Sequence, residues 1–126
     1  MLIDVFDNGE TIKVDIDPIY LHYTERKNLE PIFKDGFLGK AGDFMPVFCI
    51  NYTLARKFKI LSSLKVPGLL KSDSVCLVFS ANPALFKHYP EDACGIYQGG
   101  KPVRIPIAHQ DTVILSVQES FEFLDF

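Results

Sequence analysis

Short runs of alternating and continuous apolar residues mark the first part of the chain. Residues 2–16 alternate apolar and polar side chains on either side of Asn8-Gly9, a pair typical of the two-residue turn of a β-hairpin. A turn at Asp17-Pro18 follows. The apolar run 19–23 then predicts a short buried strand that carries one imidazole, that of His22.

The segment behind this strand has the start and stop signals of a helix. Thr24 and Asn28 are both residue types that cap a helix N-terminus, and Pro31 favours Asn28 because proline is tolerated in the first helical turn. Apolar residues at helical spacing follow, and Gly36 stands where a left-handed C-cap would end the helix.

A second strand and a second helix are expected before the middle of the chain. Residues 37–46 hold glycine, aspartate and proline and predict a loop, and residues 47–50 predict a short buried strand. Asn51 or Thr53 can then cap a helix that runs to about Leu64.

The second half predicts mostly strands. Residues 74–80 are apolar throughout and predict a central strand, and Asn82-Pro83 opens a short helical turn. Residues 88–101 are rich in glycine and predict an irregular segment. Residues 103–107 and 112–117 are expected to pair with each other around a turn. The last aromatic residues predict a final strand or a packed tail; they are Phe121, Phe123 and Phe126.

These elements together predict an α+β fold with a mostly antiparallel sheet and two or three short helices. A length of 126 residues fits one domain, residues 1–126. Because 48% of the residues are hydrophobic, the chain can form a packed core, to which eleven Phe and five Tyr should contribute much of the buried surface.

Charge and cysteine content narrow the class of protein. The net charge of −3 lacks the basic excess typical of a dedicated nucleic-acid binder. The N-terminus has no basic start or apolar run of a signal peptide, and no stretch has the length of a membrane span. Three widely spaced cysteines favour buried thiols in a reducing compartment. We therefore expect a cytoplasmic protein without a membrane association.

One pattern of residues carries chemical information. It runs His22-x-Thr24-x-x-x-Asn28-Leu29-x-x-Ile32-x-x-x-Gly36-Phe37 and continues, after a loop, as Val47-Phe48-x-x-Asn51-x-x-x-Ala55. The pattern resembles the first half of the ADP-ribosyltransferase superfamily, with its first part most similar to the DNA-modifying DarT-type toxins. Rifampin ADP-ribosyltransferases and tRNA 2′-phosphotransferases share the same outline. The resemblance covers roughly residues 20–60 and implies an ADP-ribosyltransferase-like split antiparallel sheet.

The resemblance implies that NAD is a substrate bound at the histidine strand. Transfer from NAD breaks a C–N glycosidic bond through an oxocarbenium-like state, so the protein must grip the nicotinamide ribose and hold its carboxamide. In this family His22 would bond a ribose hydroxyl and the backbone of Tyr23 would clamp the carboxamide. Thr24 would support the turn or the ribose, next to Asn28. The alternative for His22 is a core histidine beside a helix cap.

Three more residues are candidates for contacts with NAD. Phe48 occupies the position of a ring that stacks on nicotinamide. Tyr52 could supply a ring from the start of the following helix, and Arg56 could reach a phosphate. The alternatives are a half-buried tyrosine at a helix N-terminus and a solvated helix face.

The third catalytic element is where the chain departs from the family pattern. Catalytic members carry a Glu, or sometimes a Gln or Asp, near the start of a late strand. The matches here are Gln98 or, with the strands shifted, Glu119. A glutamine can hold a ribose hydroxyl but cannot supply a negative charge. The three histidines have no ligand spacing with cysteine or acidic residues, so we expect no metal site.

The first hypothesis is therefore an NAD-dependent mono-ADP-ribosyltransferase, such as a toxin, an effector or a phage-borne modifier, that acts on an unidentified protein or nucleic acid. The second is a catalytically inactive module of the same fold that binds NAD, ADP-ribose or a protein partner such as an antitoxin. A third is an enzyme similar to the RNA 2′-phosphotransferases, which also consume NAD.

Overall fold

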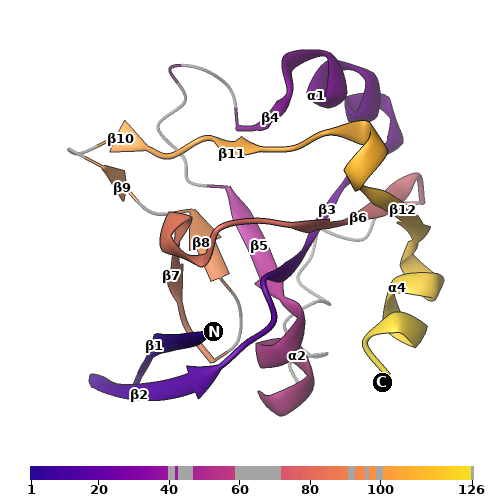
Figure 1. The fold of residues 1–126 in the computed structure, drawn as a ribbon. Coiled ribbons are helices and arrows are strands. Elements are labelled where there is room, and N and C mark those ends of the chain that lie inside the picture. The colour runs from indigo at the N-terminus through magenta and orange to yellow at the C-terminus, as the bar shows by residue number, and fades with distance from the viewer. Residues whose placement is uncertain are drawn as a thin grey trace.

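The computed structural model describes residues 1–39, 42, 47–58, 72–90, 93–95, 97–98 and 101–125, with the backbone alone between 93 and 102. Figure 1 shows the elements in space. In chain order they are β1 (Leu2–Asp7), β2 (Glu10–Asp15), β3 (Ile19–Glu25), η1 (Arg26–Asn28), α1 (Leu29–Asp35), β4 (Phe37–Leu38), β5 (Phe48–Asn51), α2 (Tyr52–Phe58), β6 (Ser74–Ser80), η2 (Pro83–Leu85), β7 (Phe86–His88), β8 (Ala93–Gly95), β9 (Tyr97–Gln98), β10 (Lys101–Pro102), β11 (Ile105–Pro106), η3 (His109–Asp111), β12 (Val113–Ser116) and α4 (Val117–Phe123).

The described strands form one large, mostly antiparallel sheet. Its eight strands follow the order β12-β6-β3-β5-β8-β7-β1-β2. The β1–β7 pair is parallel, and the other pairs of this sheet are antiparallel. Two small ladders, β10–β9 and β11–β4, lie outside it. Mixed helices and antiparallel strands confirm the α+β class.

The N-terminal hairpin is confirmed with its turn chemistry. β1 and β2 pair from Leu2↔Asp15 to Asp7↔Glu10. The two turn residues, Asn8 and Gly9, have φ angles of 48° and 81°. Positive φ at both central positions is the geometry of a type I′ turn, which the Asn-Gly pair favours.

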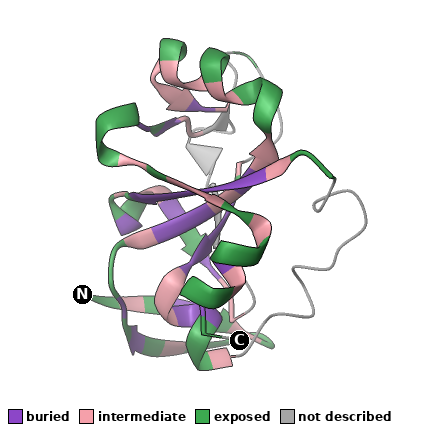
Figure 2. Ribbon diagram, turned by 90° about the vertical axis from the view of Figure 1, so that its right-hand side faces the viewer, coloured by how far each residue is buried: buried purple, intermediate pink, exposed green. Residues whose placement is uncertain are grey.

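The central strand β3 divides the core into two layers. Successive side chains of a strand point to opposite faces. Tyr20 belongs to one buried cluster with Leu77 and Phe79, while Leu21 belongs to a second cluster with Cys76. Side chains of α1 pack against the first cluster and those of α2 and α4 against the second. Buried residues concentrate on the central strands in Figure 2.

The first predicted helix is confirmed as α1, including its end. Gly36 has a φ of 80°, and its N–H donates to the carbonyl of Ile32 at 2.8 Å. A left-handed glycine at this place stops the helix and turns the chain into β4. Asn28 precedes α1 but makes no side-chain cap, and Thr24 does not cap it either, because the short η1 turn intervenes.

Asn51 is confirmed as the cap of the second helix. Its Oδ1 accepts from the N–H of Leu54 at 3.1 Å, and its Nδ2 donates to the carbonyls of Asp17 and Ile19 at 3.0 and 3.3 Å. The side chain is fully buried. The predicted stretch of this helix from 59 to 64 lies outside the described residues.

Several predictions for the second half are wrong. The segment predicted as irregular contributes β8 and the end of β7 to the large sheet. Residues 103–107 do not pair with 112–117; instead β11 pairs with β4 and β12 pairs with β6. The chain after β12 is the helix α4, which starts at the capping box of Ser116 and Glu119, so the expected final strand is wrong. The alternative, a packed tail, agrees with Phe121, which packs against the second cluster.

Two further findings concern the cysteine side chains and the length of the helices. Cys49 and Cys76 are buried thiols, and burial raises the pKa of Cys76 to about 12. Both agree with the expectation of buried cysteines. Among the described residues, no helix is long and apolar enough to cross a membrane.

Candidate functional site

The pairing between β3 and β5 stops after two residue pairs. The pairs are Tyr20↔Asn51 and Leu21↔Ile50, whereas β3 continues its ladder with β6 as far as Glu25↔Ser74. Along residues 22–24, β6 is therefore the one strand, among those described, that pairs with β3. An edge left open beside a buried core is where a ligand can reach backbone N–H and C=O groups.

His22 lies at the point where the two strands separate. Its Nδ1 is 2.8 Å from the carbonyl oxygen of Phe48. A carbonyl can only accept, so Nδ1 carries the proton and donates. The neutral ring then presents Nε2 as an acceptor. Burial lowers the pKa of the half-buried His22, and the bond to Phe48 offsets this in part, so the ring is neutral at pH 7.

Thr24 and Asn28 are placed next to His22 by the strand and the turn behind it. Thr24 is two residues from His22 and shares its face of β3. The Nδ2 of Asn28 donates to the Thr24 hydroxyl oxygen at 3.0 Å. The hydroxyl keeps its own proton for another acceptor. These two residues and His22 form a row of polar groups along one side of the open edge.

Tyr23 and Phe48 direct their side chains to the other face. The hydroxyl of Tyr23 is 2.8 Å from the Oγ of Ser120, and burial raises the pKa of this phenol. By strand alternation the Phe48 ring faces away from Cys49, a member of the cluster on the His22 side, and it is 53% exposed. The backbones of both residues remain beside the split, but their rings do not face His22.

Tyr52 and Arg56 belong to the contact between α2 and α4. Arg56 donates to the Tyr52 hydroxyl at 3.1 Å, with its guanidinium 5.4 Å from the ring centroid, and forms an ion pair with Asp125 at 3.7 Å. The Tyr52 ring packs on Phe123 at 4.8 Å. Because this contact covers the cluster of Leu21 and Tyr23, neither side chain is brought together with His22.

The two candidates for the third catalytic element lie apart from His22 or outside the described side chains. Glu119 accepts from the N–H of Ser116 at 2.9 Å and thereby caps α4 on the far face. These bonds lower the pKa of its carboxyl. Gln98 lies on β9 and pairs with Lys101, but its side chain is outside the described part of the structure.

Sequence reasoning missed a buried polar pair behind the split. The hydroxyl of Tyr20 and Nε2 of His88 are hydrogen-bonded at 2.7 Å, and the Tyr20 ring stacks on Phe86 at 4.2 Å. Burial lowers the pKa of His88 to about 4 and raises that of Tyr20. The pair was missed because residues 88–101 were expected to be irregular, so no strand was expected to place His88 in the core.

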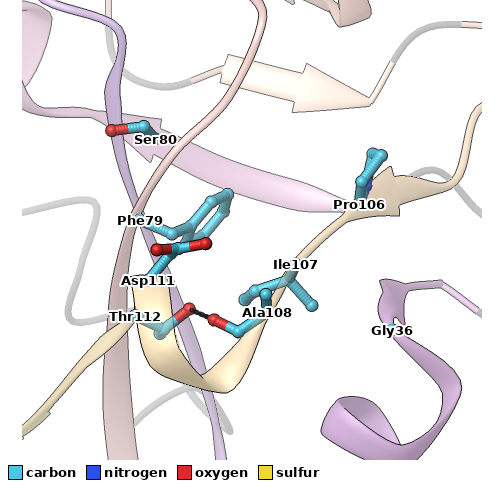
Figure 3. Close-up of a pocket in the computed structure, with 8 residues that line it drawn as sticks. All are labelled: Gly36, Phe79, Ser80, Pro106, Ile107, Ala108, Asp111 and Thr112. Carbon is cyan, nitrogen blue, oxygen red and sulfur yellow. Dashed lines mark hydrogen bonds between the residues drawn. The ribbon is translucent and has the colours of Figure 1, made fainter.

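A pocket of about 610 Å³ also opens on the molecule, and His22 is not among the residues that line it. Its wall comes from the end of α1, the end of β6 and the chain from β11 through η3. Figure 3 labels the lining residues, which are Gly36, Phe79, Ser80, Pro106, Ile107, Ala108, Asp111 and Thr112. None of them was a candidate from the sequence, because they meet through two long-range pairings, β11 with β4 and β12 with β6. The described residues contain no cluster of three or more His, Cys, Asp or Glu that could hold a metal ion.

No family model, no curated protein and no solved structure matches the chain. The expected resemblance to ADP-ribosyltransferases therefore rests on the sequence pattern between His22 and Ala55 alone.

Proposed function

We propose that this protein is an NAD-dependent mono-ADP-ribosyltransferase that binds NAD at the split between β3 and β5. The observation that carries the proposal is the bond from His22 to the Phe48 carbonyl at the point where the strands part. This bond fixes the tautomer whose Nε2 can accept a hydrogen bond from a ribose hydroxyl. The acceptor macromolecule, protein or nucleic acid, is unidentified.

The groups beside the split suit the nicotinamide riboside part of NAD. A carboxamide has one acceptor and two donors, which match the N–H and C=O groups of an open strand edge at residues 22–24. Nε2 of His22 and the hydroxyl of Thr24 supply an acceptor and a donor for the ribose. NAD itself supplies the glycosidic bond that breaks as positive charge develops on the ribose. The protein residues hold and orient that ribose.

One observation favours the second candidate, a module that binds NAD or ADP-ribose without transfer. Glu119 is committed to a helix cap on the opposite face, so its carboxylate does not stabilise charge near His22. Gln98 would then be the remaining candidate, and it is uncharged. A third candidate, RNA 2′-phosphotransferase-like chemistry, relies on several arginines, and Arg56 lies on the far face with Asp125.

The test follows nicotinamide release from NAD by the purified protein, by His22→Ala and by His109→Ala. His109 is an exposed histidine whose ring contacts that of Phe33 in a tilted arrangement at 4.7 Å, so its removal is a matched control. We expect release by the wild type and by His109→Ala, and loss in His22→Ala. Binding of NAD that needs His22, without release, selects the inactive module. Neither release nor binding by folded protein contradicts both.

A further inference from the structure

The pocket of Figure 3 combines an apolar surface with one charged group. Phe79, Pro106 and Ile107 supply apolar atoms, and Asp111 supplies a carboxylate. The volume of about 610 Å³ lies in the range of small-ligand sites. The Asp111 carboxylate makes no ion pair or hydrogen bond among the described residues. The pocket therefore presents a charge that no residue in the described part of the chain neutralises.

Nearly all hydrogen-bond donors around the pocket are already used. The N–H of Ile107 donates to Gly36, that of Asp111 to Ala108 and that of Thr112 to His109. Pro106 has no N–H to give. The Thr112 hydroxyl also donates to the Ala108 carbonyl, at 2.7 Å.

What remains for a ligand is mostly acceptors. They are the Asp111 carboxylate, the lone pairs of the Thr112 oxygen and the hydroxyl of Ser80, which can also donate. No lysine or arginine is among the lining residues. Arg104, nearby in the chain, pairs with Asp35 and donates to the Gly39 carbonyl at 3.2 Å. An anion, including the pyrophosphate of NAD, would meet uncompensated negative charge here.

We propose that this pocket binds a cationic group rich in donors, a guanidinium or a primary ammonium, carried on an aliphatic stem. The cation pairs with Asp111, and its stem lies against Phe79 and Ile107, where the ring face can also attract the cation. The proposal goes beyond the NAD site and does not depend on it. The source of the cation is either a free small molecule or an arginine or lysine side chain of a protein.

The test compares butylguanidine with butylurea, a neutral molecule of nearly the same shape, by titration followed in amide NMR spectra without NAD. We expect butylguanidine to shift the amides of Ser80, Ala108 and Thr112, and butylurea to bind much more weakly. Asp111→Asn should weaken butylguanidine binding about tenfold, as the loss of one charge-assisted hydrogen bond predicts. Glu122→Gln, which removes an exposed charge on α4, should change nothing.

Equal affinity of the two probes would overturn the proposal, as would unchanged butylguanidine binding in Asp111→Asn or absence of saturable shifts in the wild type. Asp111 is exposed in η3, so its substitution should leave the fold intact, and the spectrum of the free variant checks this. Because NAD is absent, the result is independent of whether nicotinamide release succeeds or fails.

A further arm separates the two sources of the cation. The probe is a blocked Gly-Arg-Gly peptide beside its citrulline counterpart. Binding of the arginine peptide more tightly than butylguanidine supports a protein side chain. Equal or weaker binding of the peptide supports a small free cation. Both results support a cation site, and equal affinity of the arginine and citrulline peptides counts against it.

Discussion

The chemical character of His22 is set by one backbone carbonyl. The Phe48 oxygen can only accept, so it holds the imidazole proton at Nδ1 and turns Nε2 toward the role of an acceptor. Burial acts in the same direction, because it lowers the pKa of the ring. A protonated ring would have a donor at Nε2 and would lose the ability to accept from a ribose hydroxyl.

This yields a prediction for the ring itself. His22 should be neutral with the proton on Nδ1 at pH 7, and should become charged only below the ordinary histidine pKa of about 6.5. NAD binding should accordingly persist at mildly acidic pH and decline as the pH falls through the lowered pKa. The nitrogen chemical shifts of the His22 ring, measured against pH, check both its tautomer and its pKa. A ring protonated on Nε2, or one that titrates at its ordinary pKa, would contradict them.

His88 predicts a loss of stability in acid. Its folded pKa of about 4 lies below the ordinary value, so protonation favours the unfolded chain. The contribution of His88 to the free energy of unfolding is fully present above about pH 6.5 and decreases as the pH falls. By pH 4 the protonation of this residue lowers the free energy of unfolding by roughly 3 kcal/mol. Urea unfolding at several pH values measures it. In His88→Gln, which keeps an acceptor for Tyr20 but cannot titrate, the decline should be much smaller.

The residues of the candidate site could be identified from the sequence more readily than the side chains that lie near them in the folded protein. His22, Thr24 and Asn28 are near in the chain and are brought together by one strand and one turn. Tyr52 and Arg56 were candidates because a ring and a guanidinium on the helix after Phe48 could contact NAD. Which face of the sheet they occupy depends on how α2 docks, and the docking depends on Phe123 and Asp125 at the far end of the chain.

At the scale of elements, Asn51 joins β5, α2 and the entry to β3. It is fully buried and makes three hydrogen bonds to backbone groups. Asn51→Ala should therefore cost about 3 kcal/mol of unfolding free energy, because it leaves three backbone groups without partners. Asn82→Ala, which removes an exposed cap with one bond, should cost about 1 kcal/mol or less. Equal effects in urea unfolding would contradict this account of Asn51.

The capping box of α4 gives a second prediction at this scale. Ser116→Ala removes the acceptor for the N–H of Glu119 and should lower stability by about 1 kcal/mol, measured by urea unfolding. Glu119→Gln should leave NAD binding unchanged, because the side chain lies on the face away from His22. Loss of NAD binding in Glu119→Gln, with the fold intact, would return Glu119 to the catalytic site.

Elements with strong local signals could be predicted, and those that depend on distant partners could not. The hairpin turn at Asn8-Gly9 and the end of α1 at Gly36 need specific φ angles, which these residues supply locally. β7 and β8 have three residues each and exist because β5 and β1 pair with them. A run of that length has no periodicity of its own.

At the scale of the whole molecule, the strand order explains why the C-terminal half was mispredicted. A hairpin between 103–107 and 112–117 was the local solution. The chain instead uses β11 to pair with β4 and β12 to extend the sheet beyond β6. The first pairing encloses the pocket of Figure 3 between α1 and η3. The second provides the edge from which α4 folds back onto the core.

The described residues also form two surfaces of different chemistry. The split beside His22 offers backbone groups and a neutral imidazole, while the pocket at Asp111 offers a carboxylate among apolar side chains. α2 and α4 cover the opposite face of the central strands (Figure 1). The central claim is that NAD binds at the split, on the face of β3 that α1 adjoins.

Mapping NAD binding on the amide NMR spectrum tests this claim most directly. We predict saturable shifts at His22, Tyr23, Thr24 and Asn28, lost in His22→Ala and kept in His109→Ala. Amides of α2 and α4 should move little. Shifts centred on Tyr52, Arg56 and Glu119, or no saturable shifts in the folded protein, would contradict an NAD site between β3 and β5.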